Sequence, residues 1–215
     1  MSAAAPSVKG PLPPFHVYRD FLDPGEHAAM LDWALANRPR FEESLLIGKV
    51  LDPERRISRS LRGLGPMEAV LERRLRSIVP QVFADTGTRP FQIGCFELEM
   101  VAYGDGAHFA PHTDIPVGQG RRALGGDGSG AFDRLLSGVY YFHHEPKGFS
   151  GGALRLHRFG SNEQPGDYVD VPPDQNSLVV FPSWVTHQVM EVRCPSDAFA
   201  DFRFAVNCWI CRAWG

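Results

Sequence analysis

The sequence lacks three features, each of which would indicate a particular class of protein. No run of apolar residues approaches the ~20 that are needed to cross a bilayer. The formal net charge is only −3 and the basic residues are scattered, so nothing indicates a surface for nucleic acid or an anionic membrane. Four cysteines in 215 residues do not form a disulfide framework. We therefore expect a cytoplasmic protein with no nucleic-acid or membrane partner, and the composition carries no signal for an oligomeric state.

The composition that remains is that of an ordinary globular domain. Hydrophobic residues make up 43% of the chain and charged residues 22%. A chain of this length can bury one sizeable core. Residues 1–14 contain no apolar signal-peptide core and are predicted to be a disordered lead-in. We expect a single domain over 15–215, with helical support at about 22–90 and a β core at about 91–212.

Two helices are predicted in the N-terminal part. Asp23 to Glu26 read Asp-Pro-Gly-Glu, which offers an N-cap, a proline at the first helical position and a capping-box glutamate. An apolar stripe follows and ends before Pro39. A second apolar stripe begins at Pro66, and Pro80 is expected to kink or split that helix.

From about residue 91 the sequence changes to short segments typical of strands, separated by Gly, Pro, Asp and Asn. Eight candidates are CFELEMVAY, HFAPHTD, GVYYFH, GALRLHR, DYVDV, SLVVF, THQVMEVR and FRFAVNCWI. Eight short antiparallel strands after a helical region predict a jelly roll with the helices packed on one outer sheet face. The Gly-rich segment 117–134 is either a flexible insertion or a mobile cover over a site.

The chemistry is predicted to lie around His112-Thr113-Asp114, at the end of the second candidate strand. Strand alternation puts His112 and Asp114 on one face. His187 opens the seventh candidate strand, which neighbours the second in an eight-stranded jelly roll. Two histidines and one carboxylate on one face of an octahedron suit Fe(II) oxygenases. An isolated H-x-D occurs often by chance, so the assignment needs further support.

The other histidines and the cysteines favour plainer interpretations. His143-His144-Glu145 precedes a turn, and adjacent strand residues face opposite ways, so we interpret it as loop and rim. His157 can face the barrel interior, His108 can line the mouth, and His16 and His27 are surface or packing residues. Cys208 and Cys211 form a CxxC within a predicted strand, where positions three apart face opposite sides, so buried and inert thiols are expected.

Support for the metal assignment comes from polar residues predicted inside the same barrel. Arg203 lies on the eighth strand, beside the strand of His187. A buried arginine is costly without a carboxylate partner, and its fork suits a dicarboxylate ligand. Tyr141 can offer a hydroxyl to the same carboxylate, and Tyr103 can donate to the other end of the ligand.

These residues and their order resemble a known family. The stretches are Met100 to Gly106, His112-Thr113-Asp114, Val139-Tyr140-Tyr141, Gly151 to Leu156, Phe181-Pro182, His187 and Arg203-x-Ala205-x-x-x-Trp209. Over roughly residues 91–210 the chain resembles the 2-oxoglutarate/Fe(II) dioxygenases of the prolyl 4-hydroxylase branch. The resemblance implies a double-stranded β-helix, Fe(II) bound by His112, Asp114 and His187, and 2-oxoglutarate held by Arg203 with help from Tyr141.

One departure from the family concerns the spacing of the arginine. Arg203 follows His187 by 16 residues, which is further than is usual in the family, and the run CPSDAFAD looks like an enlarged hairpin loop. Arg193 is the alternative, but the Ala205 and Trp209 spacing goes with Arg203. Asp114 is present where related halogenases have a smaller residue, which implies oxidation of a C–H bond without halogenation.

The implied reaction is hydroxylation with O2, releasing succinate and CO2, with ascorbate as a possible supporting reductant. The resemblance favours a prolyl or similar residue in a peptide or protein as substrate. A free amino acid or other small metabolite is the alternative within the same chemistry. A non-catalytic, cupin-like module that binds a metal or ligand is the alternative from another class.

Overall fold

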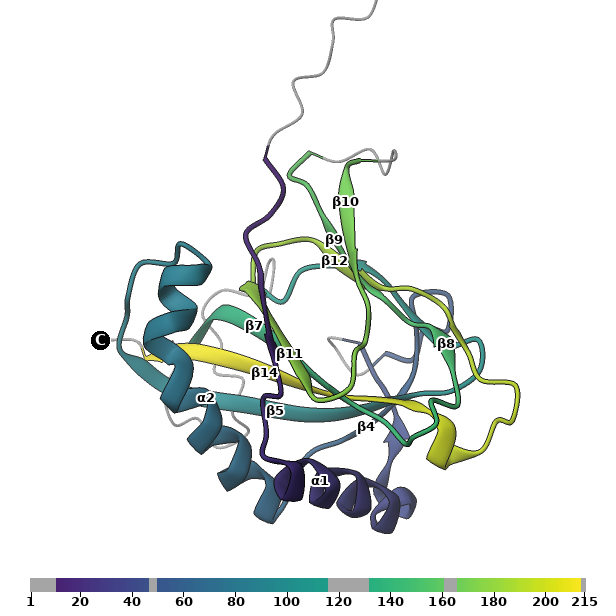
Figure 1. The fold of residues 1–215 in the computed structure, drawn as a ribbon. Coiled ribbons are helices and arrows are strands. Elements are labelled where there is room, and N and C mark those ends of the chain that lie inside the picture. The colour runs from purple at the N-terminus through teal and green to yellow at the C-terminus, as the bar shows by residue number, and fades with distance from the viewer. Residues whose placement is uncertain (1–10, 47–49, 116–131, 161–165, 214–215) are drawn as a thin grey trace, which may run out of the picture.

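The computed structural model describes residues 11–46, 50–115, 132–160 and 166–213. Two antiparallel β-sheets face each other, and two α-helices cover the outer face of the larger sheet (Figure 1). The larger sheet has the order β1 (His16–Arg19), β11 (Ser177–Pro182), β7 (Phe132–Phe142), β14 (Arg203–Ala213), β5 (Ile93–Tyr103), β4 (Arg59–Leu61) and β2 (Glu42–Glu43).

The smaller sheet lies across the core from β7, β14 and β5 (Figure 1). Its order is β10 (Tyr168–Val171), β9 (Leu154–His157), β12 (His187–Val189), β6 (His108–His112) and β3 (Arg56–Ile57). A separate ribbon pairs β13 (Val192–Arg193) with β8 (Ser150–Gly151). Two short 3-10 turns, η1 (Arg38–Arg40) and η2 (Phe199–Asp201), complete the described elements. This is the mainly β architecture with N-terminal helices that the sequence predicts.

The first helix, α1 (Pro24–Ala36), starts where the capping box predicts. The backbone N–H of Asp23 donates to the Glu26 carboxylate at 3.3 Å. The same carboxylate accepts hydrogen bonds from Arg73 and, at 2.9 Å, from Arg74 of α2 (Pro66–Asp85). The cap therefore also links the two helices.

Among the helices in the described part of the chain, none has the length and apolar character needed to span a membrane.

Of the two outcomes predicted for Pro80, a kink or a split, the split is wrong, because α2 is one helix from Pro66 to Asp85. A proline inside a helix removes one backbone hydrogen bond and crowds the preceding turn. The buried stripe of α2 continues on both sides of Pro80, through Leu75 and Val79 before it and Val82 after it. Burial of this stripe against the sheet offsets the local cost of the proline.

Short strands before and within the region expected to be helical are a second difference. β1 adds to the edge of the larger sheet by pairing with β11, and β4 and β3 pair with β5 and β6. These strands are two to four residues long, too short to show a period-two pattern.

The candidate strand THQVMEVR is divided into β12 and β13, which pair with different partners. The Gly-rich segment lies mostly outside the described residues, except for its last three residues, which begin β7.

Strand alternation on β7 sets the two faces of the larger sheet. The Tyr140 hydroxyl lies 2.6 Å from Nδ1 of His27 on α1, so Tyr140 faces the helices. Tyr141 faces the other way, with its ring 4.9 Å from the guanidinium carbon of Arg203. The inner face of the sheet therefore presents polar side chains to the space between the sheets.

Candidate metal centre and co-substrate pocket

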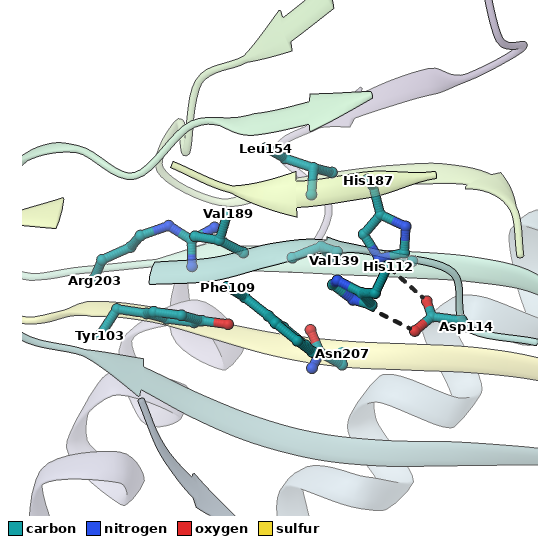
Figure 2. Close-up of a pocket in the computed structure, with 11 residues that line it drawn as sticks. Tyr103, Phe109, His112, Asp114, Val139, Leu154, His187, Val189, Arg203 and Asn207 are labelled. Carbon is teal, nitrogen blue, oxygen red and sulfur yellow. Dashed lines mark ion pairs between the residues drawn. The ribbon is translucent and has the colours of Figure 1, made fainter. Parts of the chain in front are cut away.

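Three predicted ligand side chains converge between β6 and β12. His112 and His187 are paired residues on these adjacent antiparallel strands. Nε2 of His187 lies 3.6 Å from Oδ2 of Asp114, and Nε2 of His112 lies 4.0 Å from its Oδ1 (Figure 2). One donor atom from each residue lies within 4.8 Å of the other two. The structure thus brings together residues that are 73 positions apart in the sequence.

Both imidazoles are fixed by hydrogen bonds from their other ring nitrogen. Nδ1 of His112 lies 2.8 Å from the carbonyl oxygen of Ala110, and Nδ1 of His187 lies 2.9 Å from that of Val185. A carbonyl can only accept, so each Nδ1 carries the proton and donates it. In the neutral form of each ring the lone pair is then on Nε2, which faces Asp114, and this is the tautomer that binds a metal.

Asp114 is held by a small serine network that sequence reasoning did not identify. The Ser137 hydroxyl donates to Oδ2 of Asp114 at 2.6 Å. The Ser183 hydroxyl lies 2.9 Å from that of Ser137, and the Asp114 backbone N–H donates to the Ser183 carbonyl at 3.1 Å. Both serines lie within or next to apolar runs on paired strands, and the sequence has no local pattern that points to them.

The electrostatics favour a neutral His112 and an ionised Asp114. Burial, followed by the neighbouring charge of His187, lowers the pKa of His112 to about 3. Burial opposes ionisation of Asp114. The charges of the two histidines and hydrogen bonds from Ser137 and Trp209 nevertheless hold its pKa below the usual value. When both histidines are in the neutral form, the two imidazoles and the carboxylate are a donor set for a divalent transition metal, and a six-coordinate ion held this way keeps three positions for other molecules.

A second polar group lies at the other end of the same cavity. Arg203 is 1% exposed, and its Nε donates to the carbonyl of Gly152 at 2.8 Å. Its Nη1 and Nη2, and the hydroxyl of Tyr141, make no hydrogen bond to any described residue. The guanidinium carbon lies 4.8 Å from the ring of Tyr103. Buried donors without partners indicate a place for an anionic ligand.

Gly152 makes room for this arginine. Its φ of +68° lies in the left-handed region, and an added Cβ would come within 2.6 Å of Cδ of Arg203. Both the conformation and the close contact therefore require glycine.

The two ends belong to one pocket (Figure 2). The residues that line it are Tyr103, Phe109, His112, Asp114, Gly138, Val139, Leu154, His187, Val189, Arg203 and Asn207. Figure 2 shows Arg203 and Tyr103 at one end and the three predicted metal ligands at the other. The pocket can therefore hold a short ligand with one end at the metal centre and a carboxylate at Arg203.

The family assignment follows from a comparison with protein families. Residues 98–211 match the model of the 2OG-Fe(II) oxygenase superfamily. The chain belongs to this superfamily. It is thus an enzyme of the 2-oxoglutarate- and Fe(II)-dependent class, and the family expected from the sequence is confirmed.

Individual relatives of this oxygenase match it over most of its length. A Synechocystis protein named an uncharacterized PKHD-type hydroxylase is 29% identical over 196 residues, 89% of this chain and 61% of the relative. The chain therefore spans only about three-fifths of that relative. A Trichoplax adhaerens prolyl hydroxylase, solved with a hypoxia inducible factor peptide fragment, aligns with a TM-score of 0.66 and 18% identity, over 92% of this chain and 83% of its own.

A bacterial and a viral structure extend the comparison. The Pseudomonas putida prolyl-4-hydroxylase aligns with a TM-score of 0.63 and 19% identity over 93% of both chains. A collagen prolyl hydroxylase from Paramecium Bursaria Chlorella virus-1, solved with 2-oxoglutarate, has a TM-score of 0.55 and 15% identity, over 93% of this chain and 96% of its own. At these identities the likeness concerns the fold, and it confirms the predicted jelly roll.

The other predicted residues of the oxygenase fall outside this pocket. The Arg193 side chain is 79% exposed and lies 3.9 Å from Glu191. His143 follows β7 in a loop as predicted, but it is 4% exposed, so its assignment to the rim is wrong. Its ring lies edge-on to Phe149, and packing against that ring buries it. The enlarged loop before Arg203 is present and contains η2.

Proposed function

We propose that this oxygenase hydroxylates a prolyl or similar residue of a peptide or protein, using O2 and releasing succinate and CO2. The observation that carries the proposal is the pairing, in one pocket, of the His112-Asp114-His187 group with a buried arginine whose terminal nitrogens have no partner among the described residues. Bound Fe(II) and 2-oxoglutarate would supply the O2 activation and the oxidative decarboxylation that this reaction requires.

The donor atoms present fit both groups. His112, Asp114 and His187 would hold the iron, because two Nε2 lone pairs and one carboxylate face the same point. Nη1 and Nη2 of Arg203 would take the far carboxylate of 2-oxoglutarate in a bidentate pair.

The two tyrosines have complementary roles in this proposal. Burial raises the pKa of Tyr141 to about 12, against the opposing effect of Arg203, so its hydroxyl keeps the proton that it would donate to the same carboxylate. Figure 2 shows the Tyr103 hydroxyl directed along the pocket, toward the metal end, where it can donate to the other end of the co-substrate.

Two exposed apolar side chains at the metal end favour a substrate with an apolar ring. Ile115 follows Asp114 directly and is 39% exposed. Trp184 is 49% exposed and follows Ser183, whose carbonyl accepts the Asp114 N–H. The backbones of both residues therefore adjoin residues that hold the metal end, and a pyrrolidine ring bound there could pack against their exposed side chains. The Trichoplax adhaerens enzyme, solved with a peptide fragment, supports a peptide as the carrier of that ring.

The test has two readouts that separate the chemistry from the substrate. The protein, supplied with Fe(II), 2-oxoglutarate, O2 and ascorbate, should form succinate slowly alone and faster with a proline-containing peptide that gains one oxygen atom by mass spectrometry. His112→Ala is the negative control. Succinate formation stimulated only by free amino acids or small metabolites would refute the peptide assignment. No succinate under any condition would refute the reaction.

A further inference from the structure

A second group of metal-binding side chains lies on the inner face of the larger sheet. Cys95 and Glu97 are two positions apart on β5, so they share a face, and Cys211 of β14 is the register partner of Cys95. One donor atom from each residue lies within 4.8 Å of the other two. All three side chains are outside the co-substrate pocket.

The arrangement repeats that of the first site with different donors. In the first site, His112 faces His187 across two strands and a carboxylate follows at the second position after His112. In the second, Cys95 faces Cys211 and a carboxylate follows at the second position after Cys95. We propose that Cys95, Glu97 and Cys211 form a second metal site, selective for a thiophilic divalent cation of the Zn²⁺ type.

The glutamate is already oriented for this role. Arg134 donates to Oε2 of Glu97, from Nε at 3.2 Å and from Nη2. The other oxygen, Oε1, accepts a hydrogen bond from the Cys211 thiol at 3.5 Å. An ion can replace the thiol proton at Oε1 while Arg134 keeps Oε2, which is how carboxylate ligands are commonly fixed from behind.

The charges of the group also balance when a divalent ion is bound. Two thiolates and one carboxylate carry three negative charges, which a divalent cation and Arg134 neutralise. Burial raises the pKa of both Cys95 and Cys211, so without an ion the two thiols are protonated. Binding therefore exchanges two S–H protons for one ion. Cys95 is only partly buried, which leaves room for a water molecule as the fourth ligand of a tetrahedral ion.

Cobalt(II) is the probe that distinguishes the two sites. Fully reduced protein, with free thiols counted in denaturant, is titrated with Co²⁺ and followed in the near ultraviolet, where sulfur-to-cobalt charge transfer absorbs. The first site has no sulfur ligand, so any such band reports the second site. We expect the band in wild-type protein and in His112→Ala, and its displacement by Zn²⁺. Its absence from fully reduced protein would overturn the proposal.

Single substitutions assign the band to residues. Cys95→Ser and Cys211→Ser should each weaken or abolish it, and Glu97→Gln should lower the affinity for Co²⁺. Cys208→Ala is the matched control, because Cys208 is buried on the same strand but outside the group, and it should keep the band. Should Cys211→Ser fail to fold, the partly exposed Cys95→Ser decides alone. A band of unchanged intensity and Co²⁺ affinity in Cys95→Ser would overturn the assignment.

The proton exchange gives an independent readout. While both thiols are protonated, the apparent association constant for Zn²⁺ at this site should rise about 100-fold per pH unit, because two protons leave for each ion. The measurement is made on His112→Ala so that the first site does not contribute. A pH-independent affinity would contradict thiolate ligation.

Discussion

His112 and His187 are paired residues on adjacent strands, and each donates its Nδ1 proton to the carbonyl of the residue two positions before it. The β6–β12 pairing therefore sets both the separation of the two imidazoles and their tautomer. Asp114 lies two residues beyond the end of β6 and is held by its own hydrogen bonds to Ser137 and Ser183. Hydrogen bonds within the protein therefore orient all three side chains, which lowers the cost of ordering them on binding.

Replacement of Ser137 tests the support of Asp114. Ser137→Ala removes the 2.6 Å hydrogen bond to Oδ2 and should weaken Fe(II) binding about 10- to 100-fold, as expected when the hydrogen-bond partner of a metal ligand is lost. The measurement is Fe(II) titration under anaerobic conditions. Ser177→Ala is the control, because Ser177 is also buried but bonds to the Asp174 carbonyl. Equal affinities in both variants would contradict the role of Ser137.

Replacement of Arg203 tests the co-substrate end of the pocket. Arg203→Ala removes the unpartnered Nη1 and Nη2 and should weaken 2-oxoglutarate binding by about 2–5 kcal/mol, the range found when one partner of a buried, hydrogen-bonded charge pair is lost. The KM for 2-oxoglutarate and the rise in melting temperature on adding it report the loss. Arg193→Ala, at an exposed position, should leave both unchanged. The opposite result for the two variants would transfer the role to Arg193.

Replacement of Trp184 tests the proposed substrate face. Trp184→Ala should raise the KM for a proline-containing peptide about tenfold, equivalent to about 1.4 kcal/mol, because an exposed aromatic surface for ring packing is lost. The KM for 2-oxoglutarate should not change. Trp184→Phe keeps an aromatic ring and should recover most of the affinity. A rise in both KM values would indicate a general distortion of the site.

Much of the site could be predicted from the sequence because its residues obey strand alternation. Three patterns predict which face of its strand a side chain occupies: the H-x-D spacing, the alternation of Tyr140 and Tyr141, and the run after Arg203. The structure brings Arg203 and Tyr103 together as register partners on β14 and β5. The sequence analysis assigned both side chains to the same ligand but did not predict that their strands pair.

The parts that were missed depend on partners distant in sequence. Strands β3 and β4 are two and three residues long and exist because β6 and β5 offer backbone groups to pair with. The Cys95–Cys211 pairing was missed for a related reason. The CxxC spacing directed attention to Cys208, whereas the partner of Cys211 lies across the sheet. The role of Ser137 likewise could not be predicted, because it depends on the contact of its hydroxyl with Asp114.

The contact between α1 and the larger sheet should make stability depend on pH. His27 Nδ1 and the Tyr140 hydroxyl are 2.6 Å apart, and Tyr140 also donates to Asn176 at 3.1 Å. Burial, with a smaller effect of His143, lowers the pKa of His27 below its usual value. As the pH falls below about 6.5, the unfolded chain takes up a proton at this histidine before the folded protein does. The contribution of neutral, buried His27 to the free energy of unfolding is therefore present above about pH 6.5 and is lost as the pH falls below that value.

A substitution at position 27 isolates this contribution. His27→Gln has no group that titrates in this range, so its free energy of unfolding should fall less than that of wild type between about pH 7.5 and about pH 5.5. Urea unfolding at the two pH values measures the difference, and His16→Gln, at an exposed position on β1, serves as the control. Identical pH dependence in wild type and His27→Gln would mean that His27 protonates as easily in the folded protein as in the unfolded chain. The acid sensitivity would then have to come from other groups, of which His143, whose pKa is also lowered by burial, is the first to replace.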